Sequence, residues 1–87
     1  MDKQEKLKIE AHIGHEIKQL RATLGLTQNQ LADQLDMEVA YLSKIERGNK
    51  PITSAQLLSL LAGCDHQIAT NFINNILHKI GSNDCNN

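Results

Sequence analysis

The chain has 87 residues, a formal net charge of −1, one Pro, one Tyr, one Phe and no Trp. This length leaves room for one domain, but the core is too small for the deep cleft that most enzymes use. Because strands favour aromatic and β-branched residues, a chain with few aromatics and many Leu, Ala, Gln and Asn is expected to be all-α.

The same composition bears on location and redox state. No apolar run approaches the roughly 20 residues that cross a bilayer, and the charged first residues lack the apolar centre of a signal peptide. We therefore expect a cytoplasmic protein without a membrane partner. Cys64 and Cys85 are isolated and have no metal-type spacing, which favours two reduced thiols.

The first predicted helix carries apolar residues at steps of three and four, which form one stripe on a helix: Ile9, Ile13, Ile17, Leu20 and Leu24. Gly25 follows where a helix commonly ends in a left-handed residue. Residues 1–8 are interpreted as an extension or as the start of this helix.

Two short helices are predicted next. Thr27 and Gln30 have the spacing of a capping box, so a helix is expected to begin after Thr27. Residues 36–38 interrupt the apolar pattern, which restarts at Leu42 and ends before Gly48. A helix, a tight turn and a second helix are expected, and the turn requires a residue in the left-handed region, which Asp36 adopts less easily than glycine does.

Two further helices complete the prediction. Thr53 and Gln56 repeat the capping-box spacing and open a fourth helix that stops at Gly63. Asp65 is expected to cap a fifth helix that runs to about residue 80. The chain is thus divided into an extension at 1–8, one domain at 9–80 and a polar tail at 81–87.

The segment "LRATLGLTQNQLADQLDMEVAYLSKIERGNKPIT" closely resembles the Cro and phage-repressor helix-turn-helix family, in particular small restriction-modification controller proteins and phage repressors. The resemblance spans roughly residues 17–61. It implies a compact five-helix domain that binds double-stranded DNA as a homodimer and regulates transcription, often as a repressor. Two residues depart from the family pattern: Asp36 replaces the usual turn glycine, and Glu38 stands at the cap where Ser or Thr is common.

Carried over residue by residue, the resemblance implies a set of DNA contacts on the second motif helix, at the start of the first and in the following loop: Gln28, Val39, Ala40, Tyr41, Ser43, Lys44, Asn49 and Lys50. Lys44 is the candidate for the guanine N7 and O6 acceptors, and Val39 and Ala40 for thymine methyl groups. Gln28 is expected to hold a backbone phosphate with its amide.

Several of these assignments have alternatives. Lys44 could instead contact a phosphate or only water, and Tyr41 could pack at the helix edge. Asn49 and Lys50 could belong to a solvated turn. The family also implies an ion pair between Glu46 and Arg21, which would be structural if it is buried and weak if it is exposed.

The predicted fifth helix has an apolar face that covers about half of its circumference, wider than packing on one core requires. One stripe runs through Ile68, Phe72 and Ile76, and another through Ile73, Leu77 and Ile80. We expect one stripe to pack on the domain and the other across a two-fold axis, so the candidate dimer interface comprises Phe72, Ile73, Ile76, Leu77 and Ile80. The opposite side, with Asn71, Asn74, Asn75 and Lys79, is expected to face water.

No catalytic arrangement is visible in the sequence. His12 and His15 share a helix face but have no second ligand cluster, so they are interpreted as surface histidines and no metal or cofactor is expected. The alternative to a regulator is an antitoxin that binds a protein partner as well as DNA. That alternative is disfavoured, because the segments outside the domain carry little apolar surface.

Overall fold

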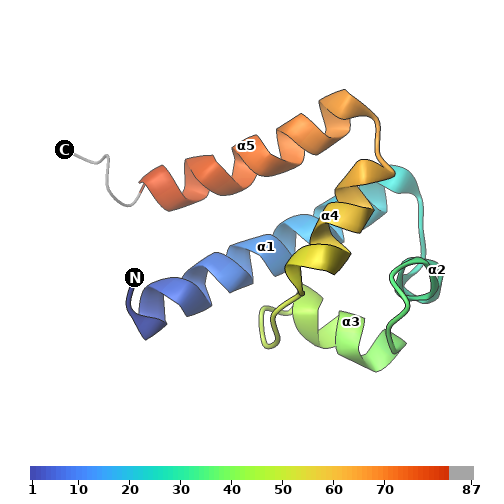
Figure 1. Cartoon of the computed structure of the whole chain (residues 1–87), viewed down its shortest axis with the longest axis horizontal. Helices are drawn as coiled ribbons and strands as arrows, with labels where there is room; N and C mark the ends of the chain where they lie inside the picture. Colours follow the sequence, from blue (N-terminus) through green and yellow to red (C-terminus); the bar gives the residue numbers. More distant parts are fainter. Residues whose placement is uncertain (83–87) are drawn as a thin grey trace.

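The computed structural model describes residues 1–82, and the regular structure in that range is entirely helical. Its five helices are α1 (Lys3–Leu24), α2 (Gln28–Gln34), α3 (Val39–Glu46), α4 (Ser54–Ala62) and α5 (His66–Ser82). The long helices α1 and α5 run side by side in opposite directions, and α2, α3 and α4 gather at one end of α1 (Figure 1). The expected all-α, five-helix fold is confirmed.

Capping boxes start three of the helices, and Asp65 caps a fourth, α5, as predicted, by accepting a hydrogen bond from the backbone N–H of Gln67 at 2.8 Å. Thr27 and Thr53 each accept a hydrogen bond from the backbone N–H three residues on, and Gln30 and Gln56 reach back, as the spacing predicts. Asp2 and Glu5 form a third capping box, so α1 begins at Lys3 and residues 1–8 are largely the first turns of α1.

The core lies where α1 is covered by the other helices. It is built by ten buried apolar residues: Ile17, Leu20, Leu31, Ala32, Leu35, Leu42, Ile45, Leu60, Phe72 and Ile76. Every helix contributes to this set. Removing their apolar surface from water is the main force that fixes the short helices α2 and α3 against α1.

Gly14 sets how closely α1 and α3 approach. A Cβ atom added to Gly14 would lie 1.9 Å from the carbonyl oxygen of Ile45, far inside van der Waals contact. Only glycine therefore permits this crossing, which brings the end of α3 directly onto the backbone of α1.

The turn between α2 and α3 is made by residues 35–38. Asp36 has a φ of 54°, in the left-handed region, as the turn requires. The backbone N–H of Met37 donates to the carbonyl of Ala32 at 3.0 Å, which closes the end of α2. Glu38 stands at the N-cap of α3 and makes no side-chain cap hydrogen bond.

The polar side of α5 does not simply face water. Asn75 Nδ2 donates to Glu16 Oε1 at 3.2 Å, and Lys79 Nζ lies 3.7 Å from Glu16 Oε2. Glu16 is buried on α1, so it attracts polar partners from α5 as the two helices pack. Asn75 is nevertheless exposed and the Lys79 side chain is 41% exposed, so both residues face water as expected while they also contact Glu16.

Within residues 1–82, no helix has both the length and the apolar character needed to span a membrane. Cys64 is a free thiol, and Cys85 lies outside the described residues. The expected polar tail overlaps α5, because Gly81 and Ser82 are helical; the remainder of that tail, 83–87, lies outside the described residues.

Candidate nucleic-acid interface

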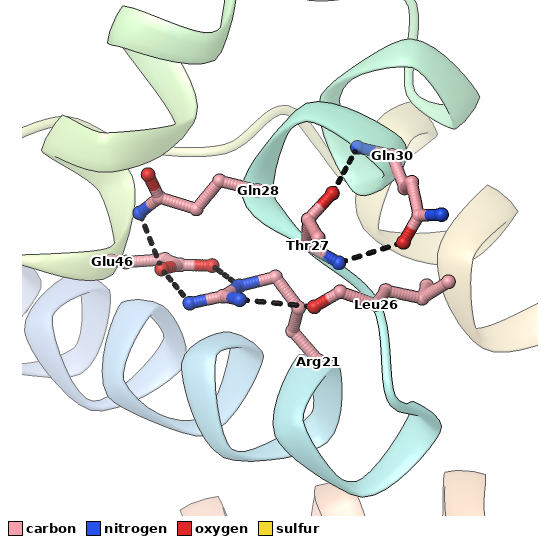
Figure 2. A network of polar contacts seen from close by, with 6 residues as sticks. All are labelled: Arg21, Leu26, Thr27, Gln28, Gln30 and Glu46. Atoms are coloured by element: carbon pink, nitrogen blue, oxygen red, sulfur yellow. Dashed lines mark hydrogen bonds and ion pairs between the residues drawn. The ribbon is translucent and has the colours of Figure 1, made fainter.

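A network of polar contacts holds α1, α2 and α3 together (Figure 2). Arg21 Nε donates to Glu46 Oε2 at 2.8 Å, and Arg21 Nη2 donates to Glu46 Oε1 at 3.1 Å. Arg21 Nη1 also donates to the carbonyl of Leu26 at 3.0 Å. The ion pair is thus bidentate, a strong and directional geometry, and it connects α1 to the end of α3 and to the segment before α2.

Burial makes this pair structural. The Glu46 side chain is 2% exposed and that of Arg21 is 18% exposed. The hydrogen bond to Glu46 raises the pKa of Arg21 above its ordinary value. The Arg21–Glu46 ion pair implied by the family resemblance is therefore present, and it is a buried, structural pair and not a weak, exposed one.

Helix α3 has one buried and one open side. Leu42, Ile45 and Glu46 point into the domain and are buried. The open side is formed by residues at one, four, five and eight positions after Val39, together with Val39 itself, which share one helix face: Val39, Ala40, Ser43, Lys44 and Arg47. All of these are exposed except Ser43, which is half-buried. We call this set the α3 face.

Arg47 also lies on the α3 face, a position that sequence reasoning did not single out. It caps α3, is exposed and donates from Nη1 to Ser43 Oγ at 3.0 Å. Its position four residues after Ser43 and eight after Val39 was the available signal, because those spacings return to one helix face.

Two expected DNA contacts have partners within the protein. The Tyr41 hydroxyl donates to the carbonyl of Pro51 at 2.8 Å, and the half-buried ring packs against the core. Its one hydroxyl hydrogen is directed to Pro51, so Tyr41 anchors the loop after α3. Gln28 Nε2 donates to Glu46 Oε1 at 2.9 Å, a contact that sequence reasoning did not anticipate.

Charge is unevenly distributed around the motif. Asp36 and Glu38 are exposed at the turn before α3, whereas Lys44 and Arg47 lie at the far half of α3. Asn49 and Lys50 are exposed in the loop that follows. A polyanion would therefore meet attraction at the end of α3 and repulsion at its start.

The two apolar stripes of α5 have different surroundings. Phe72 is 3% exposed and Ile76 is 7% exposed, because both are part of the domain core. Ile73 is 40% exposed and Leu77 58% exposed. Ile80 is half-buried and packs against the core. Phe72 and Ile76 are therefore not available to a second subunit, which corrects their assignment to an interface.

Two short helices joined by a tight turn, with the second open to solvent along one face, define a helix-turn-helix, the motif of many DNA-binding regulators. The chain belongs to the helix-turn-helix domain family, whose model matches residues 12–68. A relative in Cereibacter sphaeroides, the propionyl-CoA carboxylase regulator, is 33% identical over 49 residues, which make up 56% of this chain and 11% of that protein.

A solved structure extends the likeness to the fold. The clp gene regulator ClgR from Corynebacterium glutamicum matches with a TM-score of 0.69 at 23% identity, over 87% of this chain and 80% of that chain. At this identity the match concerns the arrangement of helices. It covers more of the chain than the family match does.

Proposed function

We propose that the protein is a transcription regulator that binds double-stranded DNA in a sequence-specific manner, with α3 in the major groove. The observation that carries the proposal is the α3 face, an open helix side held rigidly by the Arg21–Glu46 pair beneath it. An α-helix fits the major groove, and exposed Lys44 and Arg47 have donors suited to guanine or to phosphate.

The other proposed contacts are to the DNA backbone, apart from two apolar contacts to bases. Lys50 and Asn49 follow α3 in an exposed loop, where they can approach phosphates beside the groove. Gln28 flanks α3 from the start of α2 and retains a second N–H for the same purpose. Val39 and Ala40, at the first turn of α3, would contact thymine methyl groups.

The protein is further proposed to act as a symmetric dimer on an inverted repeat. Ile73 and Leu77 form an exposed apolar stripe on α5, beside a shallow hollow of about 270 Å³ lined by Ala69, Thr70 and Asn74 among others. A second copy, placed across a two-fold axis, would cover this stripe with its own. Such dimers place two recognition helices roughly 34 Å apart, one turn of DNA.

Selection of bound duplexes from a random pool, followed by a titration, tests the proposal. We expect the selected duplex to bind more tightly than a scrambled duplex of equal composition, with affinity that falls steeply as salt rises because counterions are released. Equal affinity for both duplexes at moderate salt would contradict sequence-specific binding.

A further inference from the structure

Gln28 is the first residue of α2, and neighbouring residues fix both the backbone around it and the nitrogen of its side-chain amide. The backbone around it is set by the capping box of Thr27 and Gln30, with hydrogen bonds of 2.8 and 3.1 Å. The amide nitrogen then donates to Glu46 at 2.9 Å. Figure 2 shows the nitrogen directed to Glu46 and the oxygen directed away from it.

Glu46 determines which end of this amide faces which way. The two ends of a glutamine amide have nearly the same shape, and what distinguishes them is that the nitrogen donates and the oxygen accepts. A flipped Gln28 would place its carbonyl oxygen against a carboxylate that is 2% exposed, with two acceptors in contact and no hydrogen between them. Repulsion between these oxygens therefore excludes the flipped form.

Arg21 fixes the carboxylate in turn. Both Glu46 oxygens accept from the guanidinium, so the carboxylate plane cannot rotate freely beneath Gln28. The guanidinium also holds the carbonyl of Leu26, two residues before Gln28. The Gln28 side chain and the backbone two residues before it are therefore both held by the buried Arg21–Glu46 pair.

We propose that Glu46 is a positioning residue for the DNA backbone contact of Gln28. One N–H of the Gln28 amide stays on Glu46, and the other is held ready for a phosphate oxygen. This inference rests on the proposed function, since it concerns how a DNA contact is preorganised. The ion pair that stabilises the domain then also affects DNA affinity through Gln28.

A double-mutant cycle tests this coupling. The variants are Gln28→Ala, Glu46→Gln and the double variant. Gln34→Ala is the matched control, because Gln34 is an exposed glutamine on the same helix. Dissociation constants for the selected duplex are measured at a temperature where circular dichroism shows every variant to be folded.

We expect Gln28→Ala to weaken binding about tenfold in the wild-type background, as for the loss of a hydrogen bond to a charged group. In the Glu46→Gln background the same change is expected to cost about twofold or less, and Gln34→Ala should cost nothing in either. Equal losses from Gln28→Ala in both backgrounds, or no loss in either, would overturn the coupling. Failure of the wild type itself to prefer the selected duplex would instead refute the proposed function.

A spectroscopic test needs no variant at Glu46. In the side-chain amide spectrum of the wild type, one Gln28 proton should exchange slowly with water in the free protein, since it is bonded to Glu46. Addition of the selected duplex should shift the other proton and leave the first in place. A Gln28 amide that exchanges as fast as that of Gln34, or that does not respond to DNA, would contradict the inference.

Discussion

At the scale of single residues, the ion pair beneath the α3 face is unequal in burial. Glu46 is 2% exposed, whereas Arg21 keeps 18% of its side chain in solvent and also bonds Leu26. Loss of Arg21 leaves a buried carboxylate with Gln28 alone, but loss of the Glu46 charge leaves a guanidinium that can still reach water.

We therefore expect Arg21→Ala to lower the free energy of unfolding by about 3 kcal/mol or more, and Glu46→Gln to lower it by less. Urea denaturation followed by circular dichroism measures both. Arg47→Ala is the control, because that exposed arginine bonds only Ser43 and should change stability by less than about 1 kcal/mol. Equal losses for Arg21→Ala and Arg47→Ala would show that burial of the pair contributes nothing.

Lys44 and Lys50 are both exposed, but they are proposed to have different targets. We expect Lys44→Ala to cost about 1 to 3 kcal/mol at one base position of each half-site and so to relax preference there. Lys50→Ala should weaken all duplexes alike and reduce the salt dependence of binding by about one counterion. Titration of single-base variants of the selected duplex separates the two. A uniform loss from Lys44→Ala would reassign Lys44 to a phosphate.

The left-handed turn at Asp36 is a strained position for a residue with a Cβ atom. Asp36→Gly should raise the free energy of unfolding by about 0.5 to 1 kcal/mol, since glycine adopts this φ without the steric cost. Asp36→Ala removes the same carboxylate but retains the Cβ atom. A gain as large in Asp36→Ala would mean that charge, and not backbone conformation, is responsible.

At the scale of elements, α3 begins without a side-chain cap. Glu38 has the extended backbone of an N-cap, but its carboxylate makes no hydrogen bond to the first turn. A serine there would accept from a free backbone N–H and contribute about 1 kcal/mol, partly offset by the loss of a negative charge at the helix start.

Glu38→Ser is expected to raise both thermal stability and affinity for DNA, because it adds a cap and removes a negative charge close to the phosphates. Glu38→Gln should raise affinity alone. Thermal unfolding and duplex titration distinguish these outcomes. Weaker binding by both variants would show that Glu38 contributes directly to base recognition.

Element packing also decides which parts of α5 remain open. Glu16 bonds Asn75, and Phe72 and Ile76 enter the core, so one side of α5 is committed to α1. The stripe through Ile73 and Leu77 lies beyond that side. The large apolar side chains of α5 that the domain core leaves exposed are therefore Ile73 and Leu77.

At the scale of the whole molecule, the dimer proposal predicts that charge on this stripe separates the subunits. Ile73→Glu together with Leu77→Glu should yield a monomer in sedimentation experiments at micromolar concentration. The matched control is Leu58→Glu, at an exposed leucine of α4 that is 64% exposed. Each variant should retain the helical circular dichroism of the wild type, because none of the three side chains belongs to the buried core.

The monomeric variant should also no longer bind an inverted repeat with higher affinity than a single half-site. A wild-type monomer, or a dimer unaffected by the double substitution, would contradict the proposed interface. If Leu58→Glu alone separated the subunits, the interface would lie on α4.

Short-range patterns in the sequence were sufficient to predict the five helices. Capping boxes at Thr27 and Thr53, a terminal Gly25 and apolar steps of three and four depend on residues less than two turns apart. Such signals do not need a partner segment, so they can be read from the chain. The resemblance to a helix-turn-helix family added the Arg21–Glu46 pair, which joins residues that no local pattern relates.

Only the tertiary structure decided the contacts between distant segments. Gly14 is required because the carbonyl of Ile45 lies directly opposite it. The Tyr41 hydroxyl donates to the carbonyl of Pro51. Gln28 has a locally ordinary position, yet its amide is oriented by a carboxylate 18 residues away. These roles depend on which surfaces meet when helices pack, and helical periodicity specifies a face without specifying what covers it.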